Sequence, residues 1–172
     1  SDADVDLATG YLYAQGKDPA LYNFEHMPFI KYLYGFSVML FNNPYPVTIS
    51  FGILLLVLYY YFIKKNFNNL FVSFFACTLL ILDPLFLDAT SSTLFDLGQT
   101  LFMLLYLISV LYFKNNFIFQ GIALGLFAAT KFWVTPIFFV AVLFLYKIYK
   151  KDFDMKKFVY HLFISFFVFA IP

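Results

Sequence analysis

The polar residues of this chain that could do chemistry gather in four short stretches of an otherwise apolar sequence. The stretches are SDAD at 1–4, EHMPFIK at 25–31, LDPLFLDATSSTLFD at 82–96 and ATKFW at 129–133. A carboxylate can act as general base toward an acceptor hydroxyl, whereas histidine and lysine can hold a phosphate by charge-assisted hydrogen bonds. The candidates for such chemistry are therefore the ionisable residues Asp2, Asp4, Glu25, His26, Lys31, Asp83, Asp96 and Lys131.

Several candidates also have a purely structural interpretation. Lys31 and Lys131 fit lysines whose ammonium groups extend to lipid headgroups. Asp83 fits the end of a helix because a proline follows it, and Asp96 fits the cap of the helix after it, since aspartate is favoured at that position. Both interpretations stay open for each of these residues.

The other ionisable residues have similar alternatives. The aspartates of SDADVD fit a solvated run at a chain end, and His26 fits a structural hydrogen-bonding role. His161 is interpreted as structural. Because Cys77 is the only cysteine, the sequence excludes a disulfide framework and ligation of a metal by several thiolates. No Gly-rich phosphate loop, CxxC motif or HExxH motif is present.

The composition indicates what kind of fold positions these groups. Of the 172 residues, 63% are hydrophobic and 12% charged, with a mean hydropathy of +0.82. Soluble domains are about 45–50% apolar and about 25% charged. The sequence therefore predicts an all-α polytopic membrane protein. The net charge of +1 gives no reason to expect a nucleic-acid partner.

The apolar runs predict about six transmembrane helices, since a span needs about 20 mostly apolar residues. Residues 1–44 are expected to form an external loop with helices at the membrane interface. ADVDLATGYLYAQG at 3–16 fits a short helix that stops at Gly16, and 28–42 fits an amphipathic helix too short to span. Residues 45–172 form the bundle, with spans at about 45–63, 70–87, 95–113, 117–131, 132–149 and 157–172.

Lysines predict the orientation of this bundle. If the spans alternate, eight of the 11 lysines share one side. Because an excess of lysine marks the cytoplasmic side, residues 1–44 and the loop from Asp83 to Asp96 are predicted to be external or lumenal. The expected location is the cell membrane of a prokaryote or the endoplasmic reticulum of a eukaryote. The lysines of the predicted cytoplasmic side are Lys64, Lys65, Lys114, Lys147, Lys150, Lys151, Lys156 and Lys157.

Four motifs in this order resemble the GT-C membrane glycosyltransferases, in particular the dolichyl-phosphate-mannose protein mannosyltransferases of glycosyltransferase family 39. SDAD stands where that family has an acidic motif, and HMPFIK at 26–31 is similar to its His-Pro-Pro-Leu-x-Lys motif. ILDPLFLDATSSTLFD at 81–96 resembles its Leu-Asp-Asn run, and GIALGLFAATKFW at 121–133 resembles its Gly-x-x-x-Gly-Leu-Ala-x-x-x-Lys-Trp stretch. The resemblance covers about 1–150, which corresponds to the N-terminal part of a family member.

The resemblance implies a function and a role for each candidate. The chain would transfer a sugar from a polyprenyl-phosphate or dolichyl-phosphate donor to a hydroxyl of a protein or glycan acceptor. Asp2 or Asp4 would be the catalytic base. Three residues would bind the donor phosphate, namely His26, Lys31 and Lys131. A divalent cation is possible, and the supporting acidic residues would be Glu25, Asp83 and Asp96.

The sequence also departs from the family pattern. Ala3 follows Asp2 where the family has an Asp-Glu pair, and Ser91 stands where the family often has an arginine. Members also have a transmembrane helix ahead of the acidic motif, so we expect further chain before Ser1 and after Pro172. These departures favour, as an alternative, a non-catalytic GT-C-like subunit that binds lipid or scaffolds other membrane subunits. A transporter or channel module is a third hypothesis.

Overall fold

Helices make up the regular structure of the described part of the chain. The computed structural model describes residues 2–22, 26–131, 134–151 and 154–170, and it places no strand among them, as the predicted all-α class requires. In chain order the elements are α1 (Asp2–Ala14), the 3₁₀ turn η1 (Pro19–Leu21), α2 (Pro28–Phe41), α3 (Tyr45–Phe67), α4 (Leu70–Leu82), α5 (Pro84–Ser91), α6 (Asp96–Tyr112), α7 (Phe117–Ala128), α8 (Val134–Tyr149) and α9 (Met155–Ala170).

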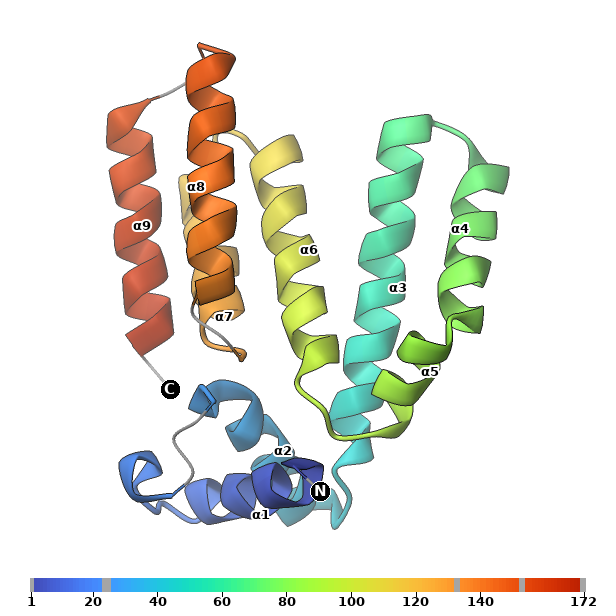
Figure 1. Ribbon diagram of the computed structural model, residues 1–172, viewed down its shortest axis with the longest axis vertical. Helices are drawn as coiled ribbons and strands as arrows, with labels where there is room; N and C mark the ends of the chain where they lie inside the picture. Colours follow the sequence, from blue (N-terminus) through green and yellow to red (C-terminus); the bar gives the residue numbers. More distant parts are fainter. Residues whose placement is uncertain (1, 23–25, 132–133, 152–153, 171–172) are drawn as a thin grey trace.

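Helices α1 and α2 form a platform that lies across one end of the bundle of longer helices (Figure 1). They pack closely because Gly10 on α1 meets Gly35 on α2. A Cβ atom at either position would overlap the backbone of the other helix. Gly16, with φ of +83°, lies just past the end of α1, where the sequence predicts the helix to stop.

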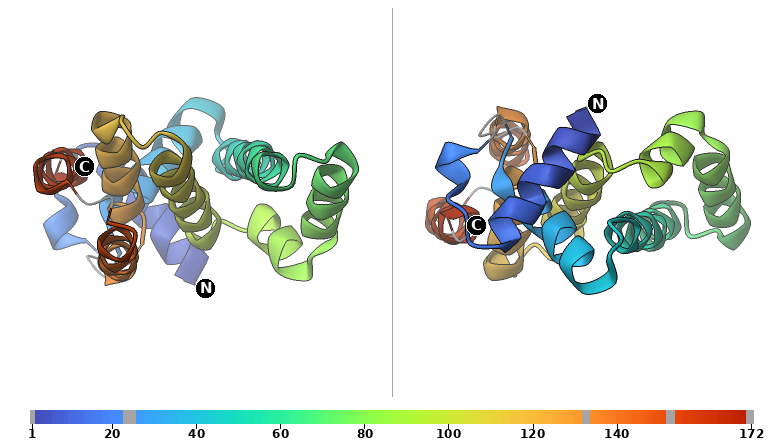
Figure 2. Two further views of the ribbon diagram at one scale, coloured as in Figure 1. Left: turned by 90° about the horizontal axis from the view of Figure 1, so that it is seen from above. Right: turned by 90° about the horizontal axis from the view of Figure 1, so that it is seen from below.

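The bundle is a row of helices that run up and down. Helix α3 packs against α4 and α6, α6 packs against α7, and α7 packs against α9 (Figures 1 and 2). The contact between α7 and α9 depends on Gly121 and Gly125, which are four residues apart on one face of α7. A Cβ at Gly125 would lie 2.6 Å from Cβ of Val168 and 2.7 Å from the carbonyl oxygen of Ser165 on α9. Small residues with this spacing allow close approach of membrane helices.

Only α3 is by itself long and apolar enough to cross a membrane in the described part of the chain. It has 23 residues and a mean hydropathy of 2.0 in its most apolar window. Helix α6 has 17 residues and α8 has 16, so each is about 24–26 Å long, less than the hydrocarbon thickness of about 30 Å. The predicted set of six full-length spans is therefore not confirmed, although the predicted segments do form helices.

The predicted span at 70–87 is bent and is not one straight helix. Helix α4 ends at Leu82, α5 begins at Pro84, and the two axes are bent by 63°. The cause is Asp83-Pro84: proline has no N–H to donate, and it forces the residue before it into an extended conformation, here φ −68° and ψ 124° at Asp83. Together α4 and α5 have the length and hydropathy of a span only as a broken pair.

The two ends of the bundle differ in charge. Lys64 and Lys65 lie in the last turn of α3, and Lys147 lies in the last turn of α8. The C-terminal ends of α3, α6 and α8 lie opposite the platform, as do the connections from α6 to α7 and from α8 to α9 (Figure 1). We call this the lysine end and the other the platform end. The eight lysines that the sequence grouped together belong to the helix ends and loops of the lysine end.

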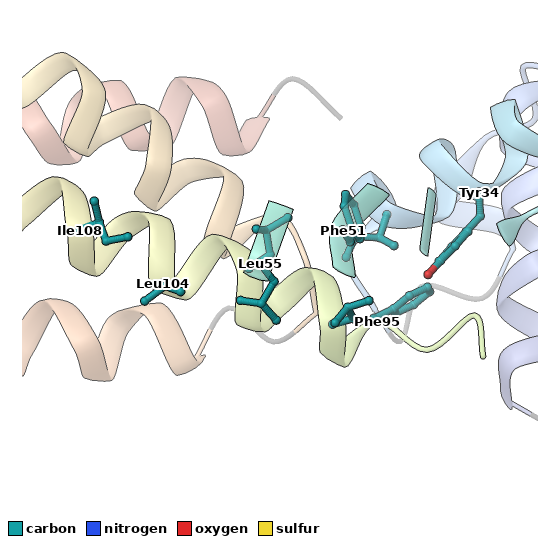
Figure 3. Close-up of a cluster of buried hydrophobic side chains, with 9 residues drawn as sticks. Tyr34, Phe51, Leu55, Phe95, Leu104 and Ile108 are labelled. Carbon is teal, nitrogen blue, oxygen red and sulfur yellow. The ribbon is translucent and has the colours of Figure 1, made fainter. Parts of the chain in front are cut away.

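A core of buried side chains joins the platform to the bundle (Figure 3). Ile30 and Tyr34 of α2 are fully buried and meet Phe51 of α3 and Phe95 just before α6. The Tyr34 hydroxyl lies 3.3 Å from the Thr48 hydroxyl of α3 and donates to the carbonyl oxygen of Leu94 at 3.5 Å. These contacts hold α2 against the first turn of α6, where several candidate residues meet.

Candidate functional site

The candidate site is built around the first turn of α6. Phe95 is 2% exposed and anchors this turn in the core. One of its neighbours is Tyr34 of α2, whose ring stacks at 6.2 Å between centroids. The other is His26, whose ring stands edge-on to Phe95 at 5.6 Å and 81°. Phe95 therefore sets the position of His26 relative to the residue that follows it, Asp96.

Asp96 and Lys131 form an ion pair at the platform end. Lys131 lies just past the end of α7, and its Nζ donates to Oδ1 of Asp96 at 2.8 Å. The lysine side chain is 20% exposed and the aspartate side chain 55% exposed, so the pair is open to solvent on one side. Lys131 is therefore held by protein, whereas the alternative interpretation had it extend to headgroups.

The Asp96 carboxylate does not cap its helix, so that alternative is wrong. Phe95 is the N-cap residue of α6, and its side chain makes no capping hydrogen bond. The first N–H groups of the helix thus keep their partial positive charge, which favours a bound anion nearby. Lys131 and the start of α6 thus place donors beside the Asp96 carboxylate, and His26 contacts the residue before it.

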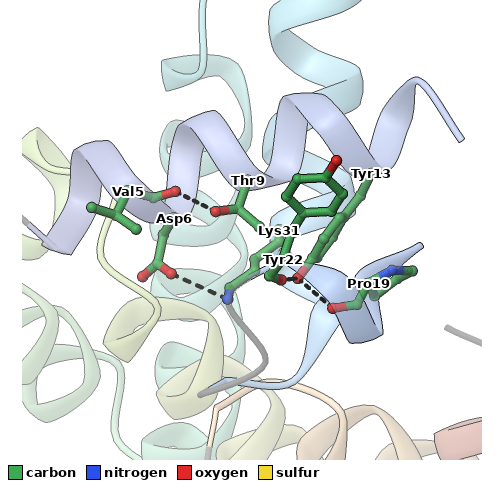
Figure 4. Close-up of polar contacts among 7 residues, drawn as sticks. All are labelled: Val5, Asp6, Thr9, Tyr13, Pro19, Tyr22 and Lys31. Carbon is green, nitrogen blue, oxygen red and sulfur yellow. Dashed lines mark hydrogen bonds and ion pairs between the residues drawn. The ribbon is translucent and has the colours of Figure 1, made fainter. Parts of the chain in front are cut away.

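Lys31 lies inside the platform and does not extend to headgroups. Its side chain is fully buried, and its Nζ lies 3.3 Å from Oδ1 of Asp6 on α1 (Figure 4). The Tyr13 ring is 6.0 Å from the same ammonium. Asp6 is 7% exposed, so the interpretation of SDADVD as a solvated run is wrong for this residue. The ion pair joins α1 to α2 beside the contact between Gly10 and Gly35.

Tyr13, beside the Asp6–Lys31 pair, forms hydrogen bonds inside the platform. The Tyr13 hydroxyl donates to the carbonyl oxygen of Tyr22 and, at 3.4 Å, to that of Pro19, which holds the η1 turn against α1 (Figure 4). Burial, followed by the neighbouring Tyr32 and the charge of Asp6, raises the pKa of the Tyr13 hydroxyl above its usual value. Burial likewise raises the pKa of Tyr34, partly offset by the Thr48 hydrogen bond. Both hydroxyls therefore stay protonated and available as donors.

Of the remaining predicted residues, Asp83 belongs to another helix start. Asp83 is the N-cap of α5, and its Oδ1 accepts from the N–H groups of Leu85 at 2.8 Å and Phe86 at 3.1 Å. This is the helix-boundary role that the sequence left open. Asp4 is exposed on α1. The Asp2 side chain and Glu25 lie outside the described residues.

An apolar groove begins beside His26. It has a volume of about 850 Å³ and runs between α7, α8 and α9. Met27 lines it at the platform end, Pro136 lies near the start of α8, and Phe158 lies near the start of α9. Because almost all of its wall is hydrocarbon, the groove suits an apolar chain whose polar head lies near His26.

No cage for a metal ion is visible in residues 2–22, 26–131, 134–151 and 154–170, where His, Cys, Asp and Glu do not form a group of three or more. The divalent cation stays a prediction. Sequence reasoning missed two residues that organise this end, Asp6 and Phe95. The sequence could have indicated the role of Asp6. Asp6, Gly10 and Tyr13 are spaced so that they lie on one face of a helix, and they therefore face the same neighbouring helix.

Comparisons of the chain with protein-family models, with curated proteins and with solved structures found no match.

Proposed function

We propose that the chain is a membrane glycosyltransferase of the GT-C type, or a part of one, that takes a sugar from a polyprenyl-phosphate donor. The observation that carries the proposal is the geometry at the platform end. His26 contacts Phe95 at the start of α6, Asp96 follows Phe95 and pairs with Lys131, and Met27, next to His26, lines the apolar groove. A lipid-linked phosphate needs both a cationic head site and an apolar tail site.

A multi-pass membrane arrangement is part of the proposal. The outer faces of the helices carry large apolar side chains, such as Phe71, Phe74 and Leu82 on α4, which are 78%, 63% and 66% exposed. Contiguous apolar surface of this kind is uncommon on soluble monomers and is stable against lipid. Helices of about 16 residues would be accommodated by local thinning of the bilayer. The lysine end would face the cytoplasm and the platform would lie at the opposite interface.

The proposed reaction is a single displacement at the anomeric carbon. The acceptor hydroxyl oxygen forms a bond to this carbon, the bond from carbon to phosphate oxygen breaks, and its electron pair leaves with the polyprenyl phosphate. The hydroxyl proton passes to the carboxylate of Asp2 or Asp4. Because the phosphate gains negative charge as it leaves, His26, Lys131 and the first N–H groups of α6 would stabilise the transition state more than the bound donor.

A second candidate function is a non-catalytic subunit of the same type, and one observation favours it. Lys31, which the resemblance assigns to the donor phosphate, is fully buried and paired with Asp6. A lysine used in this way stabilises the platform and leaves the phosphate site with fewer cations. Such a protein would bind the lipid donor or hold partner subunits without transferring the sugar.

Sugar transfer by the purified chain in lipid nanodiscs tests the proposal. The donors are radiolabelled dolichyl-phosphate mannose and an undecaprenyl-phosphate-linked sugar, and the acceptor is a peptide rich in serine and threonine. Removing the base with Asp2→Asn and Asp4→Asn together should lower kcat by at least about 100-fold. Lys131→Met should lower kcat/KM by about 10–100-fold, since it removes one charge-assisted contact to the phosphate.

The matched control is Asp88→Asn, because Asp88 is an exposed carboxylate of α5 on the same end of the bundle, outside the candidate site. It should transfer sugar at the rate of the unchanged chain. Absence of transfer from both donors together with a donor-dependent rise in Tm would favour the non-catalytic subunit. Absence of both transfer and donor binding would refute the transferase and the lipid-binding form of the second candidate.

A further inference from the structure

A second, polar pocket lies at the lysine end, opposite the candidate site. It has a volume of about 170 Å³ and is formed by the loop from α6 to α7, one side chain of α7, the end of α8 and the start of α9. The residues that line it are Lys114, Asn115, Gln120, Lys147, Asp154, Lys157, Phe158 and His161. With about 30 Å³ per water molecule in the liquid, the pocket has room for a group of several heavy atoms.

The charge of this pocket favours an anion. Three lysines and one aspartate line it, so the lining is net cationic. The aspartate, Asp154, is already used: its Oδ1 accepts from N–H groups at the start of α9, and its Oδ2 lies 3.8 Å from Nζ of Lys157. Lys114 and Lys147 line the space, and Lys157 keeps N–H donors beyond the one directed at Asp154. Helices α7 and α9 begin at this end and α6 and α8 end here, so the helix dipoles offset one another and the lysines supply the positive charge.

The deep wall of the pocket holds a buried histidine with hydrogen-bonding capacity to spare. His161 is 4% exposed, and its Nε2 has no hydrogen-bond partner among the residues that the structure describes. Its ring stacks on the buried ring of Tyr106 at 5.6 Å, which fixes its position. Gln120 beside it is 3% exposed and donates to the carbonyl oxygen of Phe113 at 2.9 Å. A buried polar atom without a partner is costly, so a ligand that accepts from it is favoured.

We propose that this pocket binds a phosphate group, held by Lys114, Lys147 and Lys157 with His161 at its base. Phe158 lines both this pocket and the apolar groove between α8 and α9. A phospholipid whose head occupies the pocket could therefore lay an acyl chain along the inner part of the groove. This continuity favours a lipid phosphate over a free one, and the lysine end is where anionic headgroups of the cytoplasmic leaflet are expected. The inference goes beyond the proposed transferase and needs no sugar donor.

The test is the thermal stability of the purified full chain in a neutral detergent, with phosphatidylglycerol or inorganic phosphate added at equal phosphate concentration. Near saturation, phosphatidylglycerol should raise Tm by about 5 °C. Lys147→Gln and Lys157→Gln should each weaken the apparent affinity about tenfold, because each removes a charge-assisted hydrogen bond. His161→Phe, which keeps the stacked ring, should also weaken it.

The matched control is Lys156→Gln, because Lys156 adjoins Lys157 in the first turn of α9, is also exposed and does not line the pocket. It should keep the full response. A response to both probes that Lys157→Gln reduces and Lys156→Gln does not would support a general phosphate site, and a response to phosphatidylglycerol alone would support a lipid site. No response to either probe, or equal losses in Lys156→Gln and Lys157→Gln, would overturn the proposal. None of these outcomes depends on sugar transfer.

Discussion

Lys31 illustrates how the surroundings of one residue decide its role. Its ammonium is out of contact with solvent, and its charge is balanced by Asp6 on the neighbouring helix. Two charges removed from water cost several kcal/mol of desolvation, which only a close partner offsets. Lys31, which the sequence places in a phosphate-binding motif, therefore fixes the crossing of α1 and α2.

The Asp6–Lys31 pair predicts a stability effect that is independent of activity. Lys31→Met removes the ammonium that faces the buried Asp6 carboxylate and should destabilise the fold by about 3–5 kcal/mol. In a chain of this size Tm should fall by about 6–20 °C. The double variant Asp6→Leu with Lys31→Met should recover most of this loss, since no charge is then buried. Circular dichroism melting in detergent measures all three.

The control for this prediction is Lys17→Met, because Lys17 is exposed after the end of α1 and the substitution removes the same charge. It should leave Tm within about 1–2 °C of the unchanged chain. Equal losses for Lys17→Met and Lys31→Met would show that the pair contributes nothing specific.

At the scale of elements, close helix contacts depend on glycines. Gly125 and Gly121 of α7 let its backbone approach α9, and Gly10 and Gly35 do the same for α1 and α2. In lipid the hydrophobic effect does not drive helices together, so van der Waals contact over such smooth faces stabilises the association. The α7–α9 contact in turn forms one wall of both the apolar groove and the polar pocket.

Gly125→Ala tests the α7–α9 contact. Alanine has the higher helix propensity by about 1 kcal/mol. The added methyl would nevertheless lie 2.7 Å from the Ser165 carbonyl oxygen, so α9 must shift, at a cost of about 1–3 kcal/mol. We expect a net fall in Tm. In Gly52→Ala the nearest atom is the Thr90 methyl at 3.0 Å, and we expect no loss beyond about 0.5 kcal/mol. A rise in Tm for Gly125→Ala would contradict the contact.

At the scale of the whole molecule, the up-and-down run of the helices separates two chemistries. The platform end holds His26 and the Asp96–Lys131 pair, and the lysine end holds the polar pocket. In a bilayer the two ends would face different compartments. The candidate transfer site and the proposed phosphate site would then be in contact with different leaflets.

Cysteine labelling in sealed vesicles measures this separation. Cys77 is first replaced by alanine. One cysteine is then placed, in separate variants, at Lys65, Lys150 or Asn42, and all three positions are exposed. A membrane-impermeant maleimide should label the cysteine at 42 from one side only and those at 65 and 150 from the other side only. Labelling of all three from one side would refute the multi-pass arrangement, and with it the placement of the candidate site on the external face.

The candidate site could be predicted only in part, and particular residues show why. Asp96 and Lys131 were singled out because ionisable groups at the ends of apolar runs are uncommon, and the structure joins them in one ion pair. Their pairing over 35 residues of sequence could not be predicted, since it depends on how α7 returns to the start of α6. Asp83 was singled out by the same rule and is a helix cap instead. An aspartate before a proline looks the same in the sequence whether it caps a helix or belongs to a functional site.

The sequence by itself determined the helical class, most helix positions and the gathering of lysines at one end, because these follow from local hydropathy, from turn residues such as Gly16 and from the alternation of direction between successive helices. Only the tertiary structure decided that Lys31 is buried against Asp6, that His26 contacts Phe95 at the start of α6 and that His161 lines the polar pocket. These outcomes depend on which helix faces touch. That choice is made by close packing between segments far apart in the chain, where the contact at Gly10 and Gly35 sets one crossing and the bend at Asp83 sets another.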